Sequence, residues 1–214
     1  MKTGIIFDMD GTLWDSSENV AASWTERLHE LGYDRNITKQ DVMGVMGLTM
    51  DRIADIIFSE LPSDERMKLL DECCGHENAY LRKNGGVLYP QLEKTLAALK
   101  EKYHLYIVSN CQSGYIEAFL EHYGFGKYFE DIECYGNNFM DKGENIALLA
   151  RRNGLEMAYY VGDIQGDYDS AKKAGTGFIH AAYGFGTINE EVPELTEFCR
   201  LPELLDSLIL TAKN

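Results

Sequence analysis

The chain has 214 residues and a formal net charge of −15 at pH 7, with 45% hydrophobic and 26% charged residues. This length suits one good-sized domain or a domain with a smaller insert, and the composition is that of a soluble globular protein. The acidity disfavours nucleic acid and anionic membranes as partners, because both bind basic surfaces. The five cysteines form neither a zinc motif nor a disulfide framework, and no apolar run reaches membrane-spanning length, so we expect a cytoplasmic protein.

The first predicted strand, residues 4–7, ends in two carboxylates and a glycine, in the order Asp8, Met9, Asp10, Gly11 and Thr12. Carboxylates this close repel each other and lose hydration at a crowded strand end, so folding alone gives little reason to place them there. Because side chains of an extended chain alternate between two faces, Asp8 and Asp10 can face the same site. We interpret this stretch as part of an active site.

Residues 16–86 predict a small, all-helical cap that follows the first strand directly. Three apolar stripes at helical spacing support it, and no convincing strand interrupts them. The stripes are Val20, Trp24, Leu28 and Leu31; Met50, Ile53, Ile57 and Leu61; and Leu70, Cys74 and Leu81. Hinges are expected near residues 15–17 and 84–86, where glycines permit unusual dihedral angles.

The rest of the chain alternates apolar runs with helical patterns, which predicts an α/β fold with a parallel sheet covered on both sides. Strands are predicted at residues 105–109, 132–135, 159–162 and 177–181. The predicted division is a core of residues 1–15 and 87–214 and a cap of residues 16–86. His180 lies in an apolar run and is interpreted as a core histidine with satisfied ring nitrogens.

Further polar residues lie where the predicted strands end or helices begin: Ser109, Asn110, Lys142, Asp163 and Asp167. Taken singly, each has a plain structural interpretation as a turn residue, a solvated lysine or a helix cap. Ligands of such sheets bind beyond the carboxyl ends of the strands, and together these residues supply what phosphoryl transfer needs. Carboxylates suit Mg²⁺, a lysine neutralises phosphate charge, and a hydroxyl with helix-start N–H groups holds phosphate oxygens.

In this order, the motifs resemble the four-motif signature of the haloacid dehalogenase-like hydrolases. The resemblance covers the whole chain, and the helical insert is similar to the small cap of the phosphoglycolate phosphatase-like branch. It implies a Rossmann-like three-layer core, a mobile cap and Mg²⁺-dependent hydrolysis of a small phosphorylated metabolite. Oligomeric state is not indicated.

The resemblance also implies residue roles. Asp8 is expected to be the nucleophile, and Asp10 the acid that protonates the leaving alcohol and then activates water. Mg²⁺ is expected to bind the Asp8 carboxylate, the Asp10 backbone carbonyl and Asp163, with Asp167 supporting from behind. Phosphate contacts are expected from Ser109, the Asn110 backbone and Lys142, and from the loop shaped by Gly11 and Thr12.

Two departures from the family pattern stand out. The third motif often continues Lys-Pro-x-Pro, whereas here Gly143, Glu144 and Asn145 follow Lys142, which makes the lysine's position less certain. Ile164 stands where the family often has threonine after the Gly-Asp pair. Neither departure removes a charged group that the mechanism needs.

Two rival functions remain open at this stage. A sugar-phosphate mutase shares the core, but its cap carries a basic pair and an early histidine, whereas residues 46–50 are uncharged and Val20 occupies the histidine position. A non-catalytic phosphate sensor lacks the insert and the late pair Asp163 and Asp167. Asp10 disfavours a dehalogenase, which has no use for a proton-donating second aspartate. Residues 44–50 and Trp14 are predicted to meet the rest of the substrate, without naming it.

Overall fold

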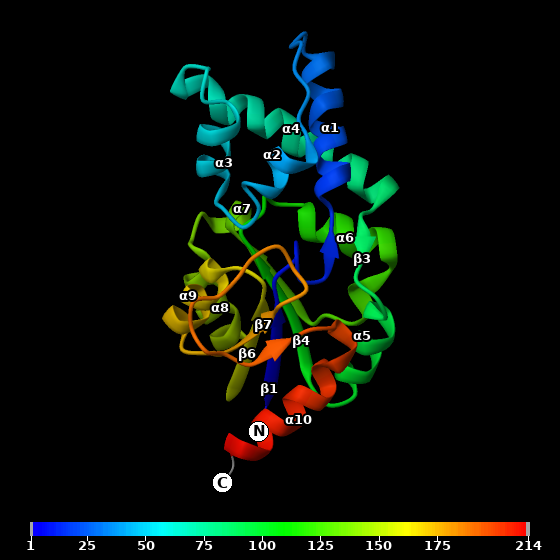
Figure 1. Cartoon of the computed structure of the whole chain (residues 1–214), viewed down its shortest axis with the longest axis vertical. Helices are drawn as coiled ribbons and strands as arrows, with labels where there is room; N and C mark the ends of the chain where they lie inside the picture. The colour runs from blue at the N-terminus through cyan, green and yellow to red at the C-terminus, as the bar shows by residue number, and fades with distance from the viewer. Residues whose placement is uncertain (1, 213–214) are drawn as a thin grey trace.

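The computed structural model describes residues 2–212 of the chain. Figure 1 shows an α/β core with a bundle of helices at one end, and the N-terminal strand runs up the middle of the core toward that bundle. The core and the helical cap were both predicted from the sequence.

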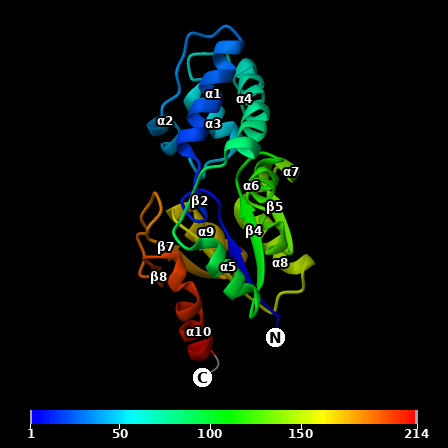
Figure 2. The same cartoon turned by 90° about the vertical axis from the view of Figure 1, so that its right-hand side faces the viewer.

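The core is built on one sheet of six strands in the order β5-β4-β1-β6-β7-β8, and all neighbouring pairs are parallel. Parallel strands place all their carboxyl ends at one edge, and here that edge faces the cap (Figure 2). The bounds are β1 Thr3–Phe7, β4 His104–Ser109, β5 Asp131–Cys134, β6 Met157–Gly162, β7 Gly177–Ala181 and β8 Glu194–Leu195.

Helices cover both faces of this sheet, because successive strand residues are apolar on both sides. Ile5 and Ile107 face α5 Leu92–Lys100, α6 Tyr115–Tyr123 and α10 Leu201–Ala212, while Ile6 and Tyr106 face α8 Lys142–Arg152 and α9 Gln165–Ala174. This three-layer arrangement confirms the predicted fold class.

The cap consists of α1 Ser17–Glu30, α2 Lys39–Met43, α3 Met50–Ile57 and α4 Ser63–Asn84. α1 packs along α4 through the predicted apolar stripes, with Trp24, Leu28, Leu70 and Leu81 all buried. Two residues were wrongly assigned to these helical stripes. Leu31 follows the end of α1 and is exposed, and Leu61 lies beyond the end of α3.

A two-stranded antiparallel ribbon joins the cap to the core, and the sequence did not predict it. It pairs β2 Trp14–Asp15 with β3 Val87–Leu88. Gly85 precedes it at φ +67° and ψ −152°, a backbone conformation that only glycine adopts without strain. The ribbon adjoins residues 15–17 and 84–86, where hinges were predicted, and hinge motion there stays a prediction.

The structure differs from the sequence analysis at three further points. Tyr135 was assigned to a strand but begins the short helix α7 Tyr135–Asn138. The short edge strand β8 was missed, because two residues carry too little pattern to be recognised. His180 is buried as predicted, but neither ring nitrogen has a hydrogen-bond partner, so it is not satisfied.

Candidate active site

The site lies at the carboxyl end of β1, the strand that runs between β4 and β6 in the sheet. Asp8 follows β1 directly, and its backbone N–H donates to the carbonyl of Val161 in β6 at 2.9 Å. Ser109 ends β4 on one side, and Asp163 follows β6 on the other. The strand order therefore brings together residues that are more than 50 positions apart in the sequence.

Lys142 connects the carboxylates of this site. Its Nζ lies 3.0 Å from Oδ1 of Asp8 and 2.7 Å from Oδ1 of Asp167, and all three side chains are at least 95% buried. Burial alone lowers the pKa of Lys142, but Asp167 and Asp8 raise it more, so the ammonium stays charged. A buried lysine without these partners would be costly, and their presence explains its depth.

A capping box holds Lys142 at the start of α8. The backbone N–H of Glu144 donates to Oδ1 of Asp141 at 3.0 Å, and the N–H of Asp141 donates back to Oε2 of Glu144 at 3.3 Å. The Lys-Pro-x-Pro prolines of the family pattern are absent after Lys142. The reciprocal cap of Asp141 and Glu144 defines the helix start instead. This resolves the uncertainty that the sequence left about the position of Lys142.

Three buried carboxylates, Asp8, Asp163 and Asp167, offer oxygen atoms within 4.8 Å of one another. Burial first, and then their mutual repulsion, raises the pKa of Asp8 and of Asp163. One lysine cannot neutralise three carboxylates, so the cluster lacks positive charge. Hard oxygen ligands in this number suit Mg²⁺, which completes its shell with water.

The three carboxylates differ in how many hydrogen-bond donors surround them. Asp167 is occupied, since Oδ2 accepts the N–H groups of Asp163 and Ile164 at 2.9 and 3.1 Å while Oδ1 accepts Lys142. Asp8 keeps Oδ1 buried without a hydrogen bond of good geometry, beyond the ionic contact with Lys142. The residues therefore fit a divalent cation held by Asp8 and Asp163, with Asp167 orienting the loop behind them.

Asp10 lies beside the cluster and is held by two hydroxyl groups. Its Oδ1 accepts hydrogen bonds from Ser16 at 2.6 Å and from the phenol of Tyr115 at 2.7 Å. Burial raises the pKa of Asp10 to about 6, and these two hydrogen bonds oppose the rise. A carboxyl group with this pKa can exchange a proton near neutral pH.

Gly11 and Thr12 shape the loop between Asp10 and the cap. Gly11 has φ +79°, and a Cβ there would lie 2.1 Å from Oδ2 of Asp163, so only glycine fits. The N–H groups of Gly11 and Thr12 donate within the turn, to Trp14 and Met9, and the Thr12 hydroxyl is buried without a partner. Contacts from this pair to a phosphate stay a prediction.

Ser109 and Asn110 lie where the core meets the cap. Nδ2 of Asn110 donates to the carbonyl of Gly47 in the cap loop at 2.9 Å. Oδ1 of Asn110 is buried and has no partner. The side chain of Asn110 therefore holds the cap loop against the core, a role that the sequence did not suggest.

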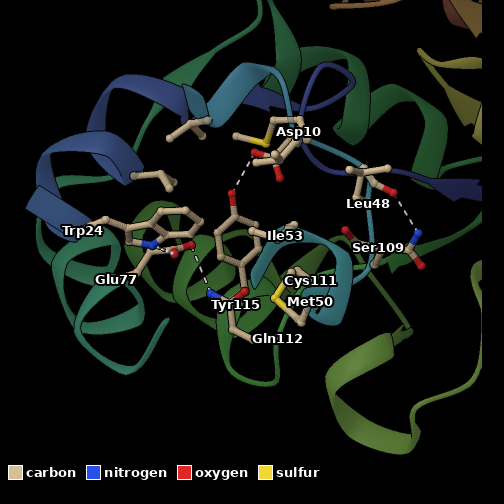
Figure 3. A pocket seen from close by; sticks show the side chains of 16 residues that line it. Asp10, Trp24, Leu48, Met50, Ile53, Glu77, Ser109, Cys111, Gln112 and Tyr115 are labelled. Atoms are coloured by element: carbon tan, nitrogen blue, oxygen red, sulfur yellow. Dashed lines mark hydrogen bonds between the residues drawn. The ribbon is translucent and has the colours of Figure 1, made fainter. Parts of the chain in front are cut away.

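A pocket of about 50 Å³ opens between cap and core and includes Asp10, Ser109 and Asn110 in its wall (Figure 3). Residues 45–48 and Met50 line it, which agrees with the prediction for the cap loop. Trp14 is not among the residues that line the pocket. It is fully buried and packs against Tyr115, Phe119 and Tyr123, so its predicted contact with substrate is wrong.

Sequence reasoning missed four residues around the site: Ser16, Glu77, Tyr115 and Phe185. Phe185 lies between two glycines, Gly184 and Gly186. The N–H of Phe185 donates to Oδ2 of Asp163 at 2.8 Å, and a Cβ at Gly184 would lie 2.4 Å from the Cβ of Asp163. The two flanking glycines were the available signal that another backbone passes close by.

The fold is an α/β core with a helical cap, and the site holds a buried lysine among aspartates. Together they define a class of capped hydrolases with an aspartate-based site. A family model described as haloacid dehalogenase-like hydrolase matches residues 5–181. The chain belongs to the haloacid dehalogenase-like hydrolases.

Known proteins agree with this assignment. A phosphoglycolate phosphatase from Aquifex aeolicus is 29% identical over 202 residues, covering 90% of each chain. One from Escherichia coli strain K12 is 28% identical over 207 residues, covering 85% of this chain and 82% of its own. A putative haloacid dehalogenase-like hydrolase from Bacteroides fragilis has the same fold, with a TM-score of 0.79 at 24% identity over 94% of this chain and 100% of its own. The predicted phosphatase class and phosphoglycolate phosphatase-like branch are confirmed.

Among residues 2–212, no helix is both long enough and apolar enough to cross a bilayer.

Proposed function

We propose that the protein is a Mg²⁺-dependent phosphatase that hydrolyses a small phosphorylated metabolite through an aspartyl-phosphate on Asp8. The observation that carries this proposal is the contact of Lys142 with both Asp8 and Asp167, next to Asp163. A buried ammonium beside a buried carboxylate reduces the repulsion that an incoming phosphate would meet.

The reaction takes two steps. A carboxylate oxygen of Asp8 attacks phosphorus, the bond from phosphorus to the leaving oxygen breaks, and Asp10 gives its proton to that oxygen. A water molecule then attacks phosphorus, Asp10 takes its proton, and the bond to Asp8 breaks to release phosphate. Asp10 can serve as acid and then as base because its pKa is about 6.

The other residues hold the phosphate and the charge. Bound Mg²⁺ supplies positive charge to the phosphate oxygens, and Asp8, Asp163 and the Asp10 backbone carbonyl are its proposed ligands. Lys142 bridges the nucleophile and the phosphate, while the Ser109 hydroxyl and the Asn110 backbone N–H bind phosphate oxygens. Asp167 orients Lys142 and the Asp163 loop.

The mutase alternative finds less support in the pocket. A mutase must hold a second phosphate or a sugar phosphate in the cap, yet none of the pocket-lining residues within 2–212 is Lys, Arg or His. The sensor alternative gives no reason for Asp10 to be held by Ser16 and Tyr115 at the mouth of a pocket. Hydrolysis therefore has the better support.

Phosphoglycolate is the first metabolite to test, because the curated relatives carry it in their names. Identity below 30% does not carry a substrate from one phosphatase to another, because the residues of the site set the substrate and the shared fold does not.

Hydrolysis of p-nitrophenyl phosphate with and without Mg²⁺ tests the proposal. We expect Mg²⁺-dependent turnover by the wild type, none by Asp8→Asn, and wild-type turnover by Asp34→Asn, which changes an exposed cap aspartate. Equal rates from the wild type and Asp8→Asn would remove Asp8 from its role.

A further inference from the structure

The pocket between cap and core has an unusual wall. Most of its cap side is apolar, contributed by Val20, Trp24, Val42, Val45, Met46, Leu48, Met50 and Ile53. Polar groups enter from Asp10, Ser109 and Asn110 at the catalytic end. Others come from Glu77 of α4, from Tyr115 of α6 and from Gln112 in the segment before α6. Its volume of about 50 Å³ accommodates roughly three to five water-sized groups.

Among the described residues of this wall, Glu77 is the only ionisable one from the cap, and it is 2% exposed. Its Oε2 accepts a hydrogen bond from the indole N–H of Trp24, and its Oε1 accepts one from Nε2 of Gln112 at 3.0 Å (Figure 3). The same amide of Gln112 donates to Oδ1 of Asn78 at 3.2 Å. Two neutral donors, one from the cap and one from the core, thus hold this carboxyl group in a fixed orientation.

No cation accompanies Glu77. None of the described residues that line the pocket is Lys, Arg or His. Burial first raises the pKa of Glu77 to about 8, and the charge of Asp10 adds to the rise. A carboxyl group in this position is costly for folding, because an apolar residue of similar size would pack there without that cost. Binding a ligand gives a reason for a carboxyl group to be there.

The same wall opposes an anionic ligand. A substrate carboxylate in the pocket would lose its hydration, find no positive partner, and lie near the carboxyl groups of Glu77 and Asp10. An ammonium group would instead favour the ionised form of Glu77. In that form each oxygen has a lone pair, beyond its present bond, for an ammonium or hydroxyl donor.

We propose that Glu77 determines specificity in this enzyme by selecting a leaving group that bears an ammonium or hydroxyl donor and by rejecting one that bears a carboxylate. This inference rests on the proposed function, because it assigns the pocket beside Asp10 to the leaving group. It places the preferred substrate among phosphate esters of small amino alcohols or diols, and it separates this chain from the activity in its relatives' names.

Four two-carbon phosphate esters that differ only at the far end test the proposal: ethanolamine phosphate, 2-hydroxyethyl phosphate, ethyl phosphate and 2-phosphoglycolate. We expect kcat/KM to fall in that order, with ethanolamine phosphate at least tenfold above 2-phosphoglycolate, because the reacting bond is of the same type throughout. A value for 2-phosphoglycolate equal to or above that for ethanolamine phosphate overturns the proposal.

Variants then test whether Glu77 is the selecting residue. Glu77→Gln is expected to reduce the preference for ethanolamine phosphate over ethyl phosphate about tenfold and to change ethyl phosphate hydrolysis less than threefold. Gln112 can turn its amide so that its oxygen accepts from the new amide, which favours folding of this variant. Glu77→Asp keeps a carboxyl group and should keep the ranking, and Glu65→Gln changes an exposed acid of the same helix as a control.

The outcomes also separate this proposal from the proposed function. Hydrolysis of p-nitrophenyl phosphate together with a preference for 2-phosphoglycolate overturns only the specificity. No hydrolysis of any ester overturns both. An unchanged ranking in folded Glu77→Gln removes Glu77 as the cause of the preference.

Discussion

The phenol of Tyr115 lies 2.7 Å from Oδ1 of Asp10, although 105 residues separate the two in the sequence. Ser16 completes a triangle, with its hydroxyl 2.6 Å from the same oxygen and 2.8 Å from the phenol. Tyr115 belongs to a core helix, and Ser16 directly precedes α1, the first helix of the cap. The proposed acid is therefore held at the junction of the two parts, where cap movement can affect it.

Tyr115→Phe should weaken catalysis at the step that needs the acid. It removes one hydrogen bond to a carboxylate, a loss of about 1.5–3 kcal/mol in general, partly offset by Ser16. We expect kcat for an alkyl phosphate to fall about tenfold and kcat for p-nitrophenyl phosphate to fall less, because nitrophenolate leaves without a proton. Steady-state kinetics on both esters measure this, and equal losses would contradict a role through Asp10.

Removal of Mg²⁺ should destabilise the folded protein. A ligand at 100 times its dissociation constant stabilises by about 2.7 kcal/mol, and here it also relieves repulsion among three buried carboxylates. We expect denaturant melts to show a stabilisation of this order with saturating Mg²⁺ and little stabilisation in Asp163→Asn. Asp169→Asn, an exposed change nearby in sequence, serves as the control, and similar Mg²⁺ effects in all three proteins would exclude Asp163 as a ligand.

The capping box at α8 should matter for catalysis as well as for stability. Asp141→Ala removes the cap, at a cost of about 1 kcal/mol, and frees the turn that carries Lys142. We expect both a lower midpoint of unfolding and a several-fold lower kcat. Asp141→Asn keeps an N-cap acceptor while weakening the ion pair with Lys173, so it separates the two effects. Should both variants lose kcat equally, the ion pair rather than the cap positions Lys142.

Glu77 should make stability depend on pH. Below pH 4.5 both the folded and unfolded states carry its proton, whereas between pH 4.5 and about 8 only the folded state keeps it. The free energy of unfolding therefore falls through this window and stays low above it. We expect Glu77→Gln to gain stability relative to the wild type across the window, on the order of a few kcal/mol in total.

Denaturant melts at several pH values measure this difference. The groups near Glu77 include Asp10, whose pKa of about 6 falls inside the window, and Cys73, Cys74 and Tyr115, whose pKa values are raised and which stay neutral there. Subtracting the wild-type curve from the variant curve removes most of the Asp10 contribution. A difference that does not change between pH 5 and pH 8 would mean that Glu77 is not held protonated.

Much of the fold could be predicted from local patterns. The five principal strands were recognised because they are short apolar runs bounded by polar residues, and α5 because Leu92, Leu96 and Leu99 share a face. Local patterns also led to the wrong prediction that Trp14 contacts the substrate. The position of an aromatic residue beside a motif does not show which way its side chain points. Its burial depends on three aromatic rings that come from 100 residues further on.

By itself the sequence determined the family, the α/β class and the set of charged groups, because Asp8, Asp10, Lys142 and Asp163 each follow a recognisable strand end or helix start. Only the tertiary structure decided that Lys142 reaches Asp8, that Tyr115 holds Asp10, and that Glu77 faces the pocket without a cation. Hydrophobic spacing reports which side of an element is buried, but not which distant element covers it. The partner of a buried polar group is set by that covering element, and no local pattern encodes it.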